Sequence, residues 1–192
     1  MKLIFFDTET TGYCPGQVCQ LSAIYMENDK LETYNHFFSV EMMNDIALGI
    51  HGFSKEKLFV LSNNTIFLEH SQEIWSFFQR ANMVIGHNVK FDVKFLQSEF
   101  RQSGYDWKPK QEFCTMQYFQ KSCNLKTKDG RLKPPKLLEL INYFALSEKE
   151  VNTKTVELFG ENCGFHDARY DTVALYLCYQ KALKNGLLTE VL

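Results

Sequence analysis

The sequence predicts a single α/β domain, built as a mixed sheet with helices packed against it. Three β-rich segments follow one another near the N-terminus with short links between them, which is typical of an antiparallel meander. A later short apolar run is followed by a helical pattern, as expected for a further strand and the helix after it. The 192 residues contain no repeat, low-complexity tract or long linker, so we expect residues 1–192 to form one domain.

The meander is predicted from the first forty residues. Residues 2–7 have the pattern of a buried strand, residues 17–27 alternate partly between apolar and polar side chains, and residues 31–40 are rich in β-forming residues. The link Asn28-Asp29-Lys30 has the composition of a turn. We therefore expect three antiparallel strands, to which parallel strands are added later in the chain.

The rest of the chain is predicted to be mainly helical. Within residues 45–61, a loop containing Ile50-His51-Gly52-Phe53 enters a short helix, with Ser54 as its N-cap. Further helices are predicted over residues 65–80, 89–102, 116–119, 136–146, 153–159 and 168–184, and further strands over 83–86 and 113–115. Gly104 and Asn185-Gly186 are the expected stops of the second and last of these helices.

Composition limits the kind of protein. A net charge of −2 and a pI near 6.2 give no global sign of a nucleic-acid partner, so such a contact would need a local basic patch. No apolar run approaches the roughly 20 residues of a membrane span, and the apolar start is too short for a signal peptide. The six cysteines form no CxxC pair, which favours buried, reduced thiols over a zinc site: Cys14, Cys19, Cys114, Cys123, Cys163 and Cys178. We expect a cytoplasmic protein without membrane contact.

Two carboxylates end the first predicted strand. In a strand, side chains alternate between faces, so Asp7 and Glu9 point the same way. Placing two ionised carboxylates on one face at the end of a buried strand costs folding free energy unless a cation lies between them. A divalent metal ion is the natural candidate, and a solvated strand end is the alternative.

Further acids and a histidine occur in two later segments. Asp92 falls in the first turns of the helix predicted after the strand over 83–86, where an ordinary surface acid is the alternative. His166 and Asp171 would diverge by about 140° if both lay on one helix. They can converge only if His166 lies in the loop before the helix, with Asp167 near its N-cap, and Gly164 makes such a loop easy.

Four carboxylates and one histidine suit hydrolysis of a phosphodiester with two metal ions. Two Mg²⁺ or Mn²⁺ ions, about 3.5–4 Å apart, can clamp the attacking and leaving oxygens. Such hard ions call for Asp and Glu rather than Cys. A histidine is suited to take the proton from the attacking water.

The motifs resemble those of the DEDDh exonucleases. Asp7-x-Glu9 with Thr10-Thr11-Gly12, Asp92 within Gly-His-Asn-Val-Lys-Phe-Asp, and His166-x-Ala168-x-x-Asp171 match the three motifs of that family in order and spacing. The family includes the proofreading subunit of bacterial DNA polymerase III, ribonuclease T, oligoribonuclease and the TREX enzymes. The resemblance implies an RNase H-like fold and 3′→5′ removal of nucleoside 5′-monophosphates from a single-stranded end. It makes residues 1–192 a single exonuclease domain.

The resemblance also implies a role for each residue. Asp7 would bridge two metal ions, Glu9 and Asp171 would complete the first site, Asp92 would hold the second, and His166 would be the general base. The residues expected to contact the substrate are Thr10, Thr11, Gly12, His51, Phe53, Asn88 and Phe91. The alternatives are that His51 caps the following helix and that Phe53 belongs to the core.

One segment has no counterpart in the family pattern. Residues 121–136 carry six basic residues and one acid, and Gly130 with Pro134-Pro135 is expected to keep them irregular. This segment is interpreted as a flexible basic arm on a phosphate backbone, or alternatively as a solvated loop. In the first interpretation, the residues that contact the nucleic-acid backbone are Lys126, Lys128, Arg131 and Lys133.

The sequence is compatible with three functions. Single-stranded DNA is the favoured substrate, an exoribonuclease is the close alternative, and an inactive nucleic-acid-binding module is the remote one. The chain lacks the longer tail by which the proofreading subunit attaches to its polymerase, so we expect it to act alone or through another contact with a polymerase or another nucleic-acid-processing partner. A monomer and a homodimer are both compatible with the sequence.

Overall fold

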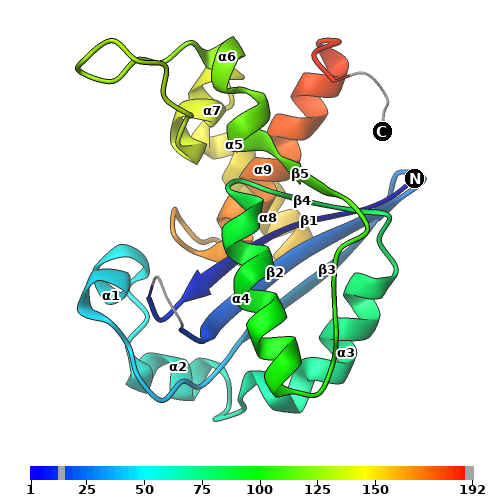
Figure 1. Cartoon of the computed structure of the whole chain (residues 1–192), viewed down its shortest axis with the longest axis vertical. Helices are drawn as coiled ribbons and strands as arrows, with labels where there is room; N and C mark the ends of the chain where they lie inside the picture. Colours follow the sequence, from blue (N-terminus) through cyan, green and yellow to red (C-terminus); the bar gives the residue numbers. More distant parts are fainter. Residues whose placement is uncertain (13–15, 189–192) are drawn as a thin grey trace.

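A computed structural model describes residues 1–12 and 16–188 of the chain (Figure 1). Five strands form one sheet in the order β3-β2-β1-β4-β5. The strands are β1 (Lys2–Thr10), β2 (Val18–Glu27), β3 (Lys30–Phe37), β4 (Met83–Gly86) and β5 (Glu112–Cys114). The pairs β1–β2 and β2–β3 are antiparallel, whereas β1–β4 and β4–β5 are parallel, so the predicted mixed sheet with its meander is confirmed.

Helices cover both faces of this sheet (Figure 1). The helices are α1 (Asp45–His51), α2 (Lys55–Leu61), α3 (Phe67–Gln79), α4 (Val89–Gln102), α5 (Thr115–Tyr118), α6 (Gln120–Cys123), α7 (Leu137–Tyr143), α8 (Glu148–Phe159) and α9 (Ala168–Lys184). The predicted bounds of α4 and α9 are confirmed. Helix α8 begins earlier than predicted, because Ser147 and Glu150 form a capping box at its start.

Side chains of β1 alternate between two separate cores. Phe5 packs edge-on against Tyr176 and Tyr179 of α9. Phe6 points to the opposite face and contacts Phe78 of α3. Because residues two apart share a face, Asp7 and Glu9 lie on the same face, as predicted, and this is the face that Phe5 shares with α9.

The segment with six basic residues is more ordered than its glycine and prolines suggested. The backbone N–H of Lys133 donates to the carbonyl of Leu125 at 2.9 Å, and that of Thr127 donates to Arg131 at 2.8 Å. These bonds close a short hairpin over residues 125–133, which we call the basic hairpin. It projects from the body of the protein after α6 (Figure 1). Apart from the end of α6 and the single Lys126–Leu132 bridge, residues 121–136 have no regular secondary structure, so the prediction of an irregular segment holds for most of it.

The cysteines differ in how deeply they are buried. Cys14 lies outside the described residues. Of the other cysteines, all free, Cys19 and Cys178 are buried, while Cys114, Cys123 and Cys163 are half-buried. Burial is therefore confirmed for only two of them.

Among the described residues, no helix combines the length and hydrophobicity that crossing a bilayer requires.

Candidate active site

The end of β1 carries the first two acids of the site. Glu9 is buried, and Asp7 is only partly exposed. Across the antiparallel pair, Asp7 lies opposite Ser22, and Glu9 lies opposite Gln20. The register shifts between Glu9 and Thr10, which bends the strand where it leaves the sheet. Both carboxylates therefore face the side chains that α9 places over this end of the sheet.

Asp92 reaches the site from the other side of the sheet. It lies in the first turn of α4, which follows β4 directly. The Thr8 backbone N–H donates to Asp92 Oδ1 at 3.2 Å, and the Thr8 hydroxyl donates to the same oxygen at 2.7 Å. The turn before α4 is tight: a Cβ on Gly86 would lie 3.0 Å from atoms of Val89, so glycine is needed there. These contacts join Asp92 to the end of β1.

A buried hydrogen-bond network places the start of α9. Asp167 is the N-cap, and its side chain accepts from the Arg169 N–H at 3.1 Å. The fully buried Gln20 of β2 donates to Asp167 Oδ1 at 2.9 Å and accepts from the Ala168 N–H at 3.0 Å. The predicted N-cap and the loop position of His166 are confirmed. His166 is exposed and has a φ of +64°.

These elements bring Glu9, His166 and Asp171 together. Each offers one ligand atom, and the three atoms lie within 4.8 Å of one another. Asp171 Oδ1 is buried and has no hydrogen-bond partner among the described residues. A buried carboxylate oxygen without a donor is costly, so this oxygen is free to bind a cation.

The acids repel one another strongly. Burial raises the pKa of Asp7 well above its usual range, and the charges of Asp92, Asp171 and Glu9 raise it further. Burial, followed by the charge of Asp171, raises the pKa of Glu9 to about 9. Burial also raises the pKa of Asp92 and that of Asp171 to about 7. At neutral pH the cluster therefore needs either protons or a cation to balance its charge.

Divalent metal ions fit this donor set. The four carboxylates supply the hard oxygen ligands that Mg²⁺ and Mn²⁺ prefer, and the orphaned Asp171 Oδ1 lacks any competing donor among the described residues. Thr8 already engages one oxygen of Asp92, which orients that carboxylate.

A cavity of about 170 Å³ lies beside the acids. Its lining residues are Thr8, Glu9, Thr10, Gly12, Ala47, Ile50, His51 and Phe91. Four of the predicted substrate contacts therefore border it. Ala47 and Ile50 were missed because α1 was not predicted. Their spacing, together with Asn44 as N-cap and Gly52 as C-cap, was the available signal.

His51 is held by two backbone contacts at the edge of this cavity. Its Nδ1 accepts from the Phe53 N–H at 3.0 Å, so Nε2 carries the proton and donates to the Thr10 carbonyl at 3.2 Å. Burial lowers the pKa of His51, which favours this neutral form. The alternative that His51 caps the next helix does not hold, because Ser54 caps α2.

Three of the predicted substrate contacts lie elsewhere. Phe53 is 5% exposed and packs against Phe37 in the core, so the core alternative describes it and its substrate role is withdrawn. The Thr11 hydroxyl accepts from the Gln17 N–H at 3.0 Å. Asn88 is exposed in the turn before α4, with a φ of +75°.

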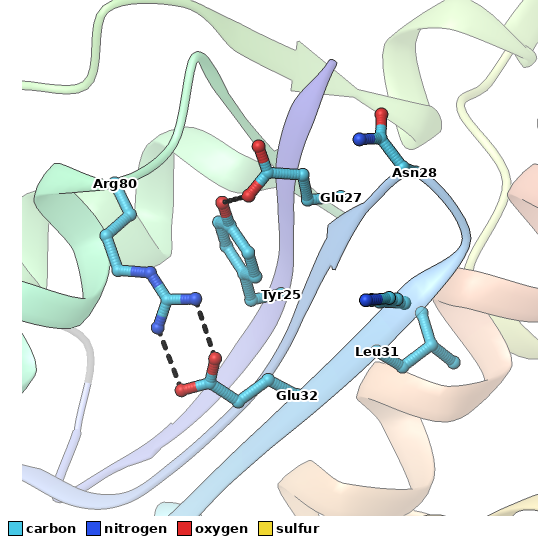
Figure 2. Close-up of a pocket in the computed structure, with 7 residues that line it drawn as sticks. Tyr25, Glu27, Asn28, Leu31, Glu32 and Arg80 are labelled. Carbon is cyan, nitrogen blue, oxygen red and sulfur yellow. Dashed lines mark hydrogen bonds and ion pairs between the residues drawn. The ribbon is translucent and has the colours of Figure 1, made fainter.

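A second cavity, of about 530 Å³, lies at the opposite end of β1 and β2 (Figure 2). Its two acids and its arginine are paired: Arg80 bonds Glu32 through two contacts of 2.8 and 2.6 Å and stacks on Tyr25. The Tyr25 hydroxyl donates to Glu27 at 2.7 Å. Since it lacks the clustered, unpaired acids found at the other end of the sheet, we assign the chemistry to the carboxylate end.

The sheet order and the helices on both faces make this an RNase H-like fold, and the carboxylate cluster at the end of its central strand defines a nuclease-type site. Residues 4–179 match the RNase_T family model, which describes an exonuclease. The chain therefore belongs to this exonuclease family.

Known proteins agree with this assignment. DNA polymerase III subunit epsilon of Rickettsia felis is 33% identical over 105 residues, covering 52% of this chain and 44% of the relative. The Escherichia coli subunit epsilon is 30% identical over 123 residues, covering 59% of this chain and 49% of the relative. The chain thus spans about half the length of these relatives or less.

The solved structure of E. coli exonuclease I with a dA16 oligonucleotide superposes with a TM-score of 0.73. It is 16% identical and covers 95% of this chain and 41% of that chain, so the likeness concerns the fold alone.

Proposed function

We propose that this protein is a metal-dependent 3′→5′ exonuclease that acts on single-stranded nucleic acid, with DNA favoured. The observation that carries the proposal is that Glu9, His166 and Asp171 each place one ligand atom within 4.8 Å of the others, beside a cavity lined by Glu9. Asp7 belongs to the same cluster, because the charges of Asp92, Asp171 and Glu9 all act on it. Two bound Mg²⁺ or Mn²⁺ ions would supply stabilisation of the charge that develops on the phosphate.

The side chains of this protein would bind the ions, remove a proton from the attacking water and contact the substrate. Asp7, Glu9, Asp92 and Asp171 would hold the ions through their carboxylate oxygens. His166 is close enough to be a ligand, but hard ions favour oxygen, so we assign it as the base that removes a proton from the attacking water. His51, Thr10 and Gly12 would border the terminal nucleotide, with the Phe91 ring at the cavity wall.

DNA is favoured because the relatives that match by sequence are named as DNA polymerase III subunits, and exonuclease I was solved with DNA oligonucleotides. The same names make a polymerase the partner class that we propose. An exoribonuclease is the second candidate, and an inactive binding module the third.

The proposal is tested by digesting 5′-labelled single-stranded DNA and RNA of one sequence side by side. With Mg²⁺, we expect a ladder that shortens from the 3′ end, faster on DNA, and release of nucleoside 5′-monophosphates. Faster loss of RNA would favour the exoribonuclease. Binding without any cleavage would favour the inactive module.

Replacing His166 by alanine is expected to lower kcat by about 10²–10⁴-fold, the usual contribution of a general base. His166 is exposed and packs no core, so the melting temperature should stay near that of the wild type. Single-turnover cleavage of the DNA in saturating Mg²⁺ provides the measurement, with the Kd for the same DNA in EDTA as a control. A cleavage rate equal to that of the wild type would contradict the role.

Replacing both Lys126 and Lys128 by glutamine is expected to weaken binding of single-stranded oligonucleotides and to flatten its salt dependence. In the described structure, the Arg131 Nε lies 2.6 Å from Asp129 and the Lys133 Nζ lies 2.6 Å from Glu139, so these two basic groups already have partners. Each lost phosphate contact should reduce the salt slope by about 0.7.

The matched control for this prediction replaces Lys149 and Lys184, which are exposed on α8 and α9. Both double variants change the net charge equally. If the two salt slopes fall by the same amount, the basic hairpin makes no specific contact with the nucleic acid.

A further inference from the structure

His87 connects the turn before α4 to the chain that follows the basic hairpin. Its Nε2 lies 3.0 Å from the Pro135 carbonyl oxygen, and its Nδ1 lies 3.0 Å from Thr115 Oγ1. A carbonyl can only accept, so the Nε2–H donates to Pro135. Burial lowers the pKa of His87 to about 4, which keeps the ring neutral. Neither contact belongs to the carboxylate cluster.

The hairpin has two further attachments: Gln120 of α6 donates to the Leu132 carbonyl at 3.4 Å, and Lys133 bonds to α7. Glu139 accepts from the Lys133 ammonium at 2.6 Å and from the Lys136 N–H at 2.8 Å. This contact fixes the hairpin to α7, whereas the His87 contact fixes it to the turn that leads to Asp92. The contact at Pro135 lies two residues beyond the hairpin and links its C-terminal end to the turn before α4. If this contact is lost, the hairpin can remain folded, but its direct link to that turn is removed.

We propose that His87 is a positioning residue: it fixes the basic hairpin to the turn before α4, so that phosphates bound by Lys126 and Lys128 lie at a set place relative to the scissile bond. This inference rests on the proposed exonuclease function. It makes the protein selective for polymers over short substrates, because only a polymer reaches the hairpin and the acids together. A preorganised second contact strengthens binding without altering the reacting groups.

Two variants separate the two contacts of His87. In His87→Gln the side-chain amide can replace the Nε2–H and donate to Pro135, whereas in His87→Asn the shorter amide reaches only the position of Nδ1, near Thr115. Each variant is assayed on the p-nitrophenyl ester of thymidine 5′-monophosphate and on single-stranded DNA of about 20 nucleotides, longer than most single-strand sites. Binding of the same DNA is measured in EDTA by fluorescence anisotropy.

We expect His87→Asn to raise KM for the DNA by about fivefold, the effect of one typical hydrogen bond, with kcat unchanged. The Kd in EDTA should rise by the same factor. Hydrolysis of the ester should be unaffected, and His87→Gln should behave like the wild type on both substrates.

The proposal is overturned if both variants bind DNA like the wild type, or if ester hydrolysis falls in parallel with DNA hydrolysis, which would mean that His87 supports the metal site instead. A wild type that hydrolyses neither substrate would count against the exonuclease function. The Kd values of the two variants would still decide the role of His87.

Discussion

Replacing Asp7 with asparagine is expected to reduce exonuclease activity by about 10³-fold or more, since in the proposed mechanism the loss of a metal ligand removes several kcal/mol of charge stabilisation. The same change should make the metal-free protein more stable. In the wild type, burial and four neighbouring carboxylates raise the pKa of Asp7, so its ionised form opposes folding. A neutral amide of the same shape removes that repulsion.

The two effects are measured by single-turnover cleavage in Mg²⁺ and by thermal melting in EDTA. In a chain of this size, each kcal/mol shifts Tm by about 2–4 °C, so a rise of several degrees is expected. Asp29→Asn is the matched control, because Asp29 is exposed in the β2–β3 turn with a φ of +64°, which asparagine tolerates. Full activity in Asp7→Asn would show that the acids have been misassigned.

Removal of metal with EDTA is expected to abolish cleavage, and Mg²⁺ or Mn²⁺ should restore it and raise Tm more at pH 8 than at pH 6. The folded-state pKa values of Asp92 and Asp171, about 7, and of Glu9, about 9, lie above their ordinary values. Their stabilising contribution is therefore complete below about pH 4 and is lost as pH rises through 7 and 9.

A bound cation favours the ionised acids and releases protons, so it should offset this loss most at high pH. The measurement is Tm against pH, with EDTA and with Mg²⁺. If the metal-free curve rises from pH 6 to pH 8 and Mg²⁺ adds a constant increment, the acids do not bind the ions as a charge-coupled cluster. Cleavage that survives EDTA would exclude the metal-dependent mechanism.

The parts of this site that follow from local patterns could be predicted from the sequence. Alternation along residues 2–7 was enough to put Asp7 and Glu9 on one face, and the helical spacing argument was enough to put His166 in a loop. Both depend on residues only a few positions apart. Helix α1 was missed because it is short and opens with Asp45-Ile46, next to a loop-like composition.

The contacts that join these parts could not be predicted. The Thr8 bond to Asp92 spans 84 positions, and the Gln20 bond to Asp167 spans 147. Such bonds depend on the sheet order, which no local pattern specifies. Likewise, the charge of residues 121–136 was visible in the sequence, but the attachment to His87 depends on how Pro135 packs.

The central strand separates two cores, and the acids come from both sides of it. Asp92 arrives with the helix on one face, Asp171 with the helix on the other, and Asp7 and Glu9 with the strand between them. A chain in which only one layer has docked holds part of the ligand set. The carboxylate cluster is therefore complete only when the helices on both faces have packed against the sheet, so loss of either core would separate the acids.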